Sequence, residues 1–100
     1  MPGFATSVAH NLGTAAAVQR LTAFLDGVRR DYGDKLSDVR GTWEESTLHF
    51  GFTIYGMAIQ GSLAATEDAV SVSGKLPLAA AIFRGQVEKS IRDELLKLLS

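Results

Sequence analysis

The sequence TLHFGFTIY, residues 47–55, decides the fold, because it holds the strongest secondary-structure signal in the chain. Large apolar side chains alternate along it with small or polar ones, so one set would face a core and the other would face solvent. The expected inward set is Leu48, Phe50, Phe52 and Ile54. A register error of one residue would instead bury His49 and Thr53. The stretch predicts a β-strand with one buried face, and therefore a sheet that needs a covering layer.

Further strand-like segments flank this stretch on both sides. Residues 35–43 precede it across a short connection at residues 44–46. Two more segments follow the reversal that Gly56 allows, and their expected inward side chains are Met57, Ile59 and Leu63 in residues 57–65, and Val70 and Val72 in residues 69–75. Because the connections are short, we expect these strands to pair antiparallel. Residues 4–10 alternate more weakly and predict a short edge strand.

Two segments with helical periodicity lie outside the strand-rich region. The first is expected from about Ala15 to Tyr32, with Thr14 as its N-cap and Gly33 as its stop. The second is expected to begin near Pro77, a residue suited to the first helical position. Its predicted buried stripe is Phe83, Val87, Ile91, Leu95 and Leu98, and four opposite-charge pairs are spaced four residues apart: Arg84–Glu88, Glu88–Arg92, Lys89–Asp93 and Asp93–Lys97.

These elements predict an α+β fold in the order β-α-β-β-β-β-α. Two amphipathic helices need an apolar surface, and one face of the alternating strands offers it. We therefore expect an antiparallel sheet of four or five strands with both helices packed on one face. With 100 residues the chain fits one domain, residues 1–100, with a single modest core.

Composition argues against several classes of function. The chain has 10 basic and 11 acidic residues, a formal charge of −1, so it lacks the basic excess typical of nucleic-acid binding. It has no cysteine for disulfides or thiolate chemistry, which fits a cytoplasmic protein. Residues 1–10 do not resemble a signal peptide, and no apolar run is long enough for a membrane span.

No recognisable catalytic, metal or cofactor-binding constellation appears in the sequence. His10 and His49 are its two histidines, and we expect His49 to be solvated and His10 to bond to nearby backbone. Glu44 and Glu45 are adjacent in a turn and would point in different directions. The candidate nucleophiles Ser7, Ser62, Ser71 and Ser73 lie outside any Gly-x-Ser-x-Gly elbow, and no histidine is expected near them. We therefore predict a protein that is not an enzyme, with no cofactor and no metal.

A second apolar stripe stands out on the last predicted helix. On a continuous helix Leu78, Ile82 and Leu96 would project in nearly the same direction, away from the Phe83–Val87–Ile91 stripe. These three residues form the candidate interaction surface. A loop of the same chain, a second copy of the chain, or another apolar surface could cover it.

The layout of the chain resembles a known family. The segment His10-Asn11-Leu12-Gly13 precedes an amphipathic helix, and a strand ending at Trp43 turns at once into residues 47–50. A strand with Gly61-Ser62-Leu63, a Val-rich strand and Leu76-Pro77 before a charged helix follow. Over about residues 10–99 this order resembles the polyhydroxyalkanoic acid system family, small bacterial proteins associated with polyhydroxyalkanoate storage genes.

The resemblance implies a setting, and no catalytic residue can be carried over from it. It favours a non-enzymatic accessory protein of polyhydroxyalkanoate storage, cytoplasmic and located at the storage granule. Such a protein would bind the granule surface, a granule protein, or itself as a homo-oligomer. The alternative is a small module that binds an acyl or hydroxyacyl ligand in a cavity between sheet and helices. A third, weaker alternative is an enzyme whose site a single sequence does not reveal.

Overall fold

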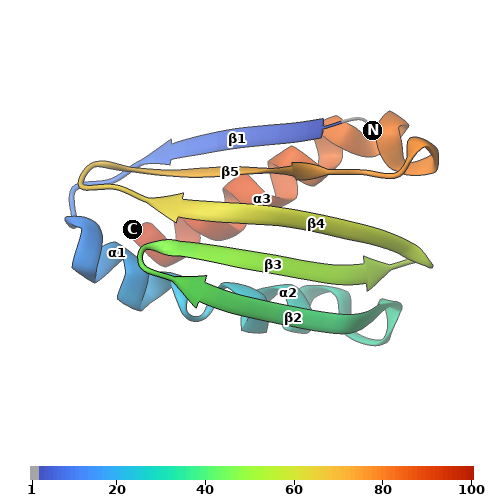
Figure 1. The fold of residues 1–100 in the computed structure, drawn as a ribbon, viewed down its shortest axis with the longest axis horizontal. Helices are drawn as coiled ribbons and strands as arrows, with labels where there is room; N and C mark the ends of the chain where they lie inside the picture. The colour runs from blue at the N-terminus through green and yellow to red at the C-terminus, as the bar shows by residue number, and fades with distance from the viewer. Residues whose placement is uncertain (1–2) are drawn as a thin grey trace.

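One twisted five-stranded antiparallel sheet, covered on one face by helices, forms the protein (Figure 1). The computed structural model describes residues 3–100. The strands are β1 (Gly3–Ala9), β2 (Leu36–Glu44), β3 (Thr47–Ile54), β4 (Met57–Ala65) and β5 (Ala69–Lys75), in the spatial order β1-β5-β4-β3-β2. The helices are α1 (Thr14–Leu21), α2 (Phe24–Tyr32) and α3 (Arg84–Leu99), with short 3-10 helices at Gly33–Lys35 and Leu78–Phe83. The predicted α+β class, antiparallel sheet and one-sided helical layer are confirmed.

The predicted register of the central strand is also confirmed. Leu48, Phe50, Phe52 and Ile54 are buried, whereas His49 is exposed. The ring of Phe50 lies edge-on to Phe24, with 5.6 Å between centroids, and stacks with Phe52 at 6.1 Å. β3 reverses into β4 through Tyr55 and Gly56, both with positive φ (52° and 75°), which is the geometry of a tight hairpin turn. These aromatic contacts form the centre of the core.

The predicted first helix is in fact two helices, so the expected continuous span from Ala15 to Tyr32 is wrong. The hydroxyl of Thr22 donates to the carbonyl oxygen of Gln19 at 2.7 Å. That oxygen would accept from the amide of Ala23 in a continuous α-helix, but this amide donates to Arg20 instead, at 3.3 Å. A side-chain hydroxyl that competes for a helical carbonyl breaks the ladder in this way, and a new helix starts at Phe24.

The N-cap prediction for Thr14 is also wrong. Gly13 takes the N-cap position with φ 81°, and no side chain of α1 caps the helix. Glu67, in the turn between β4 and β5, accepts from the amide of Thr14 at 3.3 Å and from its hydroxyl at 3.1 Å. A carboxylate at a helix N-terminus is favourable, and here it comes from a distant part of the chain. Sequence neighbours alone could not predict this cap.

The last α-helix begins at Arg84 rather than near Pro77. Leu78–Phe83 forms a 3-10 helix, which turns more tightly than an α-helix, so directions projected along one continuous helix do not apply to it. The side chain of Phe83 is 49% exposed and is not part of the buried stripe. Leu99 is fully packed in the core and Leu98 only partly. The buried stripe of α3 is Ile91, Glu94, Leu95 and Leu99.

Two charged side chains of α3 contact the edge strand instead of the helical partners predicted for them. In the described part of the chain, one of the four predicted helical pairs forms, between Lys89 and Asp93 at 2.9 Å. Glu88 instead accepts from the amide of Ala5 at 2.8 Å, and Arg92 donates to the carbonyl oxygen of Ser7 at 2.7 Å. Because α3 packs along β1, these bonds satisfy outward-pointing backbone groups of that edge.

Candidate functional site

A pocket of about 450 Å³ opens between α2, α3 and the inner face of the sheet. Its volume is in the range of sites that bind small molecules. Strand residues form its floor and the two helices form its walls. The apolar side chains that line it are Phe24, Val28, Phe52, Ile54, Ile59, Val87 and Ile91. Polar and charged lining residues come from the helices, namely Asp31, Tyr32, Ser90, Asp93, Glu94 and Lys97.

Glu94 is a buried carboxylate in the wall of this pocket. Its side chain is 6% exposed, and it lies on the buried stripe of α3 between Ile91 and Leu95. Oε1 of Glu94 is the buried side-chain oxygen in residues 3–100 that has no hydrogen-bond partner. Burying a carboxylate oxygen without a partner destabilises a protein, so its presence needs a physical explanation.

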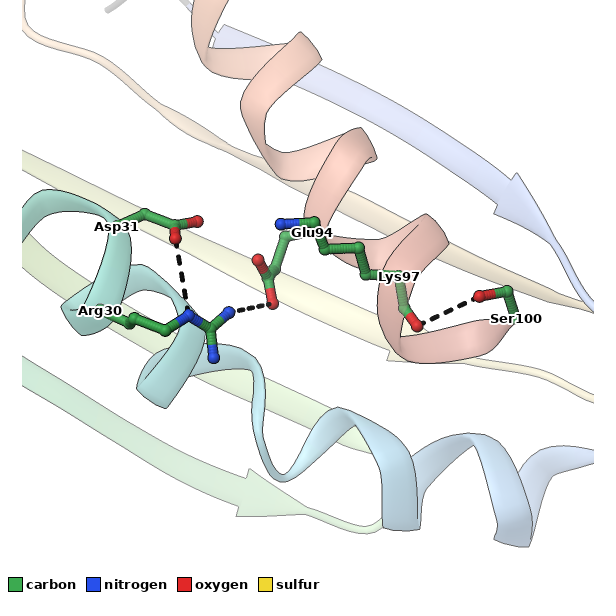
Figure 2. Close-up of polar contacts among 5 residues, drawn as sticks. All are labelled: Arg30, Asp31, Glu94, Lys97 and Ser100. Carbon is green, nitrogen blue, oxygen red and sulfur yellow. Dashed lines mark hydrogen bonds and ion pairs between the residues drawn. The ribbon is translucent and has the colours of Figure 1, made fainter.

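Arg30 is the cation nearest to this carboxylate (Figure 2). Its Nη2 lies 3.7 Å from Oε2 of Glu94, and its Nε lies 3.7 Å from Oδ1 of Asp31. The Arg30 side chain is 65% exposed, so water screens both pairs and each contributes little. Lys97, one turn after Glu94 on α3, also lines the pocket. Charges of both signs therefore surround Oε1 of Glu94, the acceptor without a partner, at the polar end of the pocket.

Gly27 on α2 makes room for Glu94. A Cβ atom at this position would overlap Oε2 and Cδ of the Glu94 carboxylate. A glycine inside a helix costs about 1 kcal/mol relative to alanine, yet α2 carries one at its packed face. Sequence reasoning missed both residues. A charged residue on the apolar stripe of α3 and a glycine in the buried face of the facing helix were the available signals.

A second apolar hollow of about 360 Å³ continues towards the end of the sheet where β3 turns into β4. It shares Tyr32, Ile54, Ile59, Val87 and Ser90 with the first pocket, and it is also lined by Tyr55, Met57, Ala80, Phe83 and Gln86. Tyr55 and Phe83 in its lining are 64% and 49% exposed, and Leu78 and Ile82, in the 3-10 helix that contributes Ala80 and Phe83 to the lining, are 82% and 84% exposed. We call these four residues the apolar end.

The three residues of the candidate interaction surface do not form one stripe. Leu78 and Ile82 belong to the apolar end, whereas Leu96 is 44% exposed near the C-terminus of α3. About 18 Å of α-helix separates Arg84 from Leu96, at 1.5 Å per residue. In addition, the chain changes from a 3-10 helix to an α-helix at Arg84, so the common direction expected on one continuous helix does not apply to these residues.

His10 lies where the sequence indicated. It is 6% exposed, its Nδ1 accepts from the amide of Leu12 at 3.1 Å, and its Nε2 lies 3.1 Å from the carbonyl oxygen of Thr66. Both ring nitrogens are thus bonded to backbone, as predicted. The ring ties the end of β1 to the β4–β5 turn.

No histidine was expected near the candidate serines, but His49 lies close to one of them. Nδ1 of His49 lies 3.1 Å from Oγ of Ser62, its direct partner across β3 and β4, and Nε2 lies 3.2 Å from Oε1 of Glu44. The row lies on the outer face of the sheet, with side chains 50% exposed for His49 and 78% exposed for Glu44. Ser62 lies within a paired strand, so nearby amides serve the sheet ladder rather than an oxyanion.

Residues 5–99 match the model of the family described as polyhydroxyalkanoic acid system protein. The chain belongs to this family. The match covers both walls of the pocket, the apolar end and all but the first residues of the sheet. None of the curated proteins compared with the chain matches it in sequence.

Two solved structures are similar to this chain at low sequence identity. The solution structure of the Aha1 dimer from Colwellia psychrerythraea is similar with a TM-score of 0.62 and 13% identity, over 99% of this chain and 94% of that one. The crystal structure of TTHA0849 from Thermus thermophilus gives a TM-score of 0.45 and 13% identity, over 98% of this chain and 94% of that one. The first likeness shows a shared fold.

Metal clusters and membrane-spanning helices are both absent from residues 3–100. No three His, Cys, Asp or Glu side chains there lie close enough to hold a metal ion together. None of the helices in the same range is both long enough and apolar enough to cross a membrane.

Proposed function

We propose that this chain is an accessory protein of polyhydroxyalkanoate storage that binds the polyester granule surface through its apolar end and catalyses no reaction. Family membership supports the storage setting. The observation that carries the mode of action is the pair Leu78 and Ile82, which expose 82% and 84% of their surface in one short helix. On this proposal the protein works in the cytoplasm, at the boundary of the granule.

The chemistry of the apolar end suits an apolar surface. Residues 76–83 carry no charge, and exposed Lys75 and Arg84 flank them. Removing a large aliphatic side chain from water stabilises by about 1.5–3 kcal/mol, so covering Leu78 and Ile82 would supply a useful part of a binding free energy. The flanking cations can remain at the boundary and donate hydrogen bonds to ester carbonyl oxygens.

The exposed pair Leu78 and Ile82 suits a polyester surface better than it suits a partner protein with a pocket for each side chain. Leu78 and Ile82 are exposed on a tight 3-10 helix, which suits insertion into a soft apolar phase. The exposed row of Glu44, His49 and Ser62 lies on the outer face of the sheet and takes no part in this binding. A homo-oligomer formed through the same residues is the competing occupant.

Binding to washed polyhydroxyalkanoate particles tests the proposal. We expect the wild type to sediment with the particles and Leu78→Lys/Ile82→Lys to stay in the supernatant, with an unchanged circular dichroism spectrum. Leu96→Lys is the control, because it places a lysine at another exposed leucine, on α3 away from the apolar end, and it should still sediment. Equal sedimentation of the wild type and the double variant would contradict the proposal. Analytical ultracentrifugation would reveal self-association as the alternative use of these residues.

A second candidate function is the binding of an acyl or hydroxyacyl ligand. The pocket of about 450 Å³ with apolar walls favours it, since a core packed to completion would leave no such space. Titration with a neutral aliphatic ester, followed by NMR on the methyl groups of Ile59 and Ile91, tests whether the pocket is occupied.

A further inference from the structure

The inference starts from Oε1 of Glu94, a buried oxygen without a hydrogen-bond partner in residues 3–100. Leucine at this position would continue the apolar stripe of Ile91 and Leu95 and would leave no polar atom without a partner. The chain instead holds a carboxylate there and accommodates it with a glycine on the facing helix. The residues at positions 27 and 94 thus fit each other, because the absent side chain of Gly27 leaves the space that the Glu94 carboxylate fills. An ordinary apolar residue at each position would fill the core without a buried charge. Arg30 lies beside Oε2, which leaves Oε1 without a partner in residues 3–100 and able to accept from a ligand.

We propose that the pocket binds a neutral aliphatic chain carrying a hydroxyl group, and that this hydroxyl donates to Oε1 of Glu94. The inference rests on the second candidate function and names its ligand class. An ionised carboxylate only accepts hydrogen bonds, so the ligand must supply the donor. The walls of Phe, Val and Ile side chains require the remainder of the ligand to be apolar.

The charges at the pocket select against an anionic ligand. Three carboxylates line it, those of Asp31, Asp93 and Glu94, against the ammonium of Lys97 and the guanidinium of Arg30 beside Glu94. A free fatty acid would bring a further negative charge close to the buried carboxylate of Glu94, which is unfavourable where water is scarce. An esterified or otherwise neutral acyl chain avoids this repulsion.

The charge of Glu94 already has a cationic partner, so its open oxygen needs a hydrogen-bond donor rather than a second cation. The guanidinium of Arg30 already lies 3.7 Å from Oε2 of Glu94, so an alkylammonium would meet a second cation beside its acceptor. A hydroxyl group satisfies Oε1 without adding charge. The preferred ligand is therefore an aliphatic ester or acyl chain with a hydroxyl group, the chemistry of a hydroxyalkanoyl unit.

Two matched esters test the inference. Methyl 3-hydroxyoctanoate and methyl octanoate differ by one hydroxyl group and can both be titrated by methyl NMR. We expect the wild type to bind the hydroxy ester roughly 10- to 100-fold more tightly, which is the range for a hydrogen bond to a charged group. Octanoate and octylamine should bind more weakly than the hydroxy ester.

Variants at Glu94 separate recognition from packing. Glu94→Leu should lose the preference between the esters while still binding methyl octanoate, because the apolar walls remain. Glu94→Gln replaces the carboxylate with a neutral amide whose oxygen can still accept a hydrogen bond. This variant should prefer the hydroxy ester less strongly than the wild type does. Leu78→Lys/Ile82→Lys should show the wild-type preference, which separates this inference from granule binding.

Each remaining outcome overturns the inference. Equal wild-type affinity for the two esters would leave an acyl-binding pocket without hydroxyl recognition. Failure of both esters to bind would remove the second candidate function together with the inference. Tighter binding of octylamine than of the hydroxy ester would show that Glu94 recognises a cation.

Discussion

The carboxylate of Glu94 on α3 occupies the space that a side chain on Gly27 of α2 would fill. The two helices lie on the same face of the sheet and approach closely at this point because one residue has no side chain. Two apolar side chains would pack at least as well at this position. The contact of a buried carboxylate with a glycine therefore lowers stability, while it places a specific chemical group between the helices. We therefore expect the effect of a substitution at one of these positions on the free energy of unfolding to depend strongly on the residue at the other.

A double-mutant cycle between these residues measures that dependence. Gly27→Ala should destabilise the wild type by about 1–3 kcal/mol, because the new methyl group overlaps the carboxylate. In a Glu94→Ala background the same change should stabilise by up to about 1 kcal/mol, since alanine favours a helix over glycine. Urea denaturation of the four proteins gives the free energies of unfolding. An identical effect of Gly27→Ala in both backgrounds would show that the residues are independent.

Phe50→Ala should destabilise the protein by about 3–5 kcal/mol. The ring is buried against Phe24 and Phe52, and its loss would leave a cavity at the centre of the core. Thermal and urea denaturation would detect a change of this size in a small domain. Phe83→Ala is the control for removal of an aromatic ring, and its effect should be far smaller because Phe83 is 49% exposed. A melting temperature of Phe50→Ala close to that of the wild type would contradict the assignment of the core.

The sheet could be predicted from sequence, because alternation specifies both a strand and its buried face. Residues 47–55 show this most clearly, and their neighbours are joined by short turns that leave few alternative pairings. The helix boundaries could not be predicted as well. The break after Leu21 depends on which donor reaches the carbonyl of Gln19, and the cap of α1 depends on Glu67 from a remote turn. The spacing of apolar residues gives no information on which groups make these two hydrogen bonds.

The hydrogen bond between Glu88 and Ala5 should protect the β1 edge. Glu88→Ala leaves the amide of Ala5 without its acceptor, so we expect the exchange of that amide with solvent to accelerate by roughly tenfold or more. Hydrogen exchange followed by NMR resolves this single amide. Lys89→Ala is the matched control, since Lys89 pairs with Asp93 on the exposed side of α3. Unchanged exchange at Ala5 in Glu88→Ala would show that the helix does not protect this edge.

The contact between Lys89 and Asp93 gives a prediction about pH. The hydrogen bond to Asp93, together with its negative charge, raises the pKa of Lys89 above the ordinary value of 10.5. A raised folded-state pKa contributes stability that is fully present below the unfolded-state value and is lost as pH rises through the folded-state value. Asp93→Asn should therefore lower the pKa of Lys89 towards 10.5, measurable by NMR titration of the lysine side chain. No change in that pKa would mean that the pair is absent in solution.

The candidate site could be predicted only in part. The exposure of Leu78 and Ile82 followed from their separation from the buried stripe, but their grouping with Leu96 required a continuous α-helix that the chain does not form. The pocket depends on how far apart two helices lie on the sheet, which no local pattern specifies. Glu94 was nevertheless visible as a charge on an apolar stripe, and such a residue is worth noting in any amphipathic helix.

The pairing of β1 with β5 determines when the fold can be completed. β2 to β5 form successive hairpins whose partners are close in sequence, whereas Gly3 pairs with Lys75 and Ser7 contacts Arg92. During synthesis the first strand must therefore wait until almost the whole chain has emerged, and such long-range contacts slow folding. Until β1 docks, the outer edge of β5 stays unpaired and can join a strand of another nascent chain. Conditions that delay the C-terminal part of the chain should thus favour aggregation through β5.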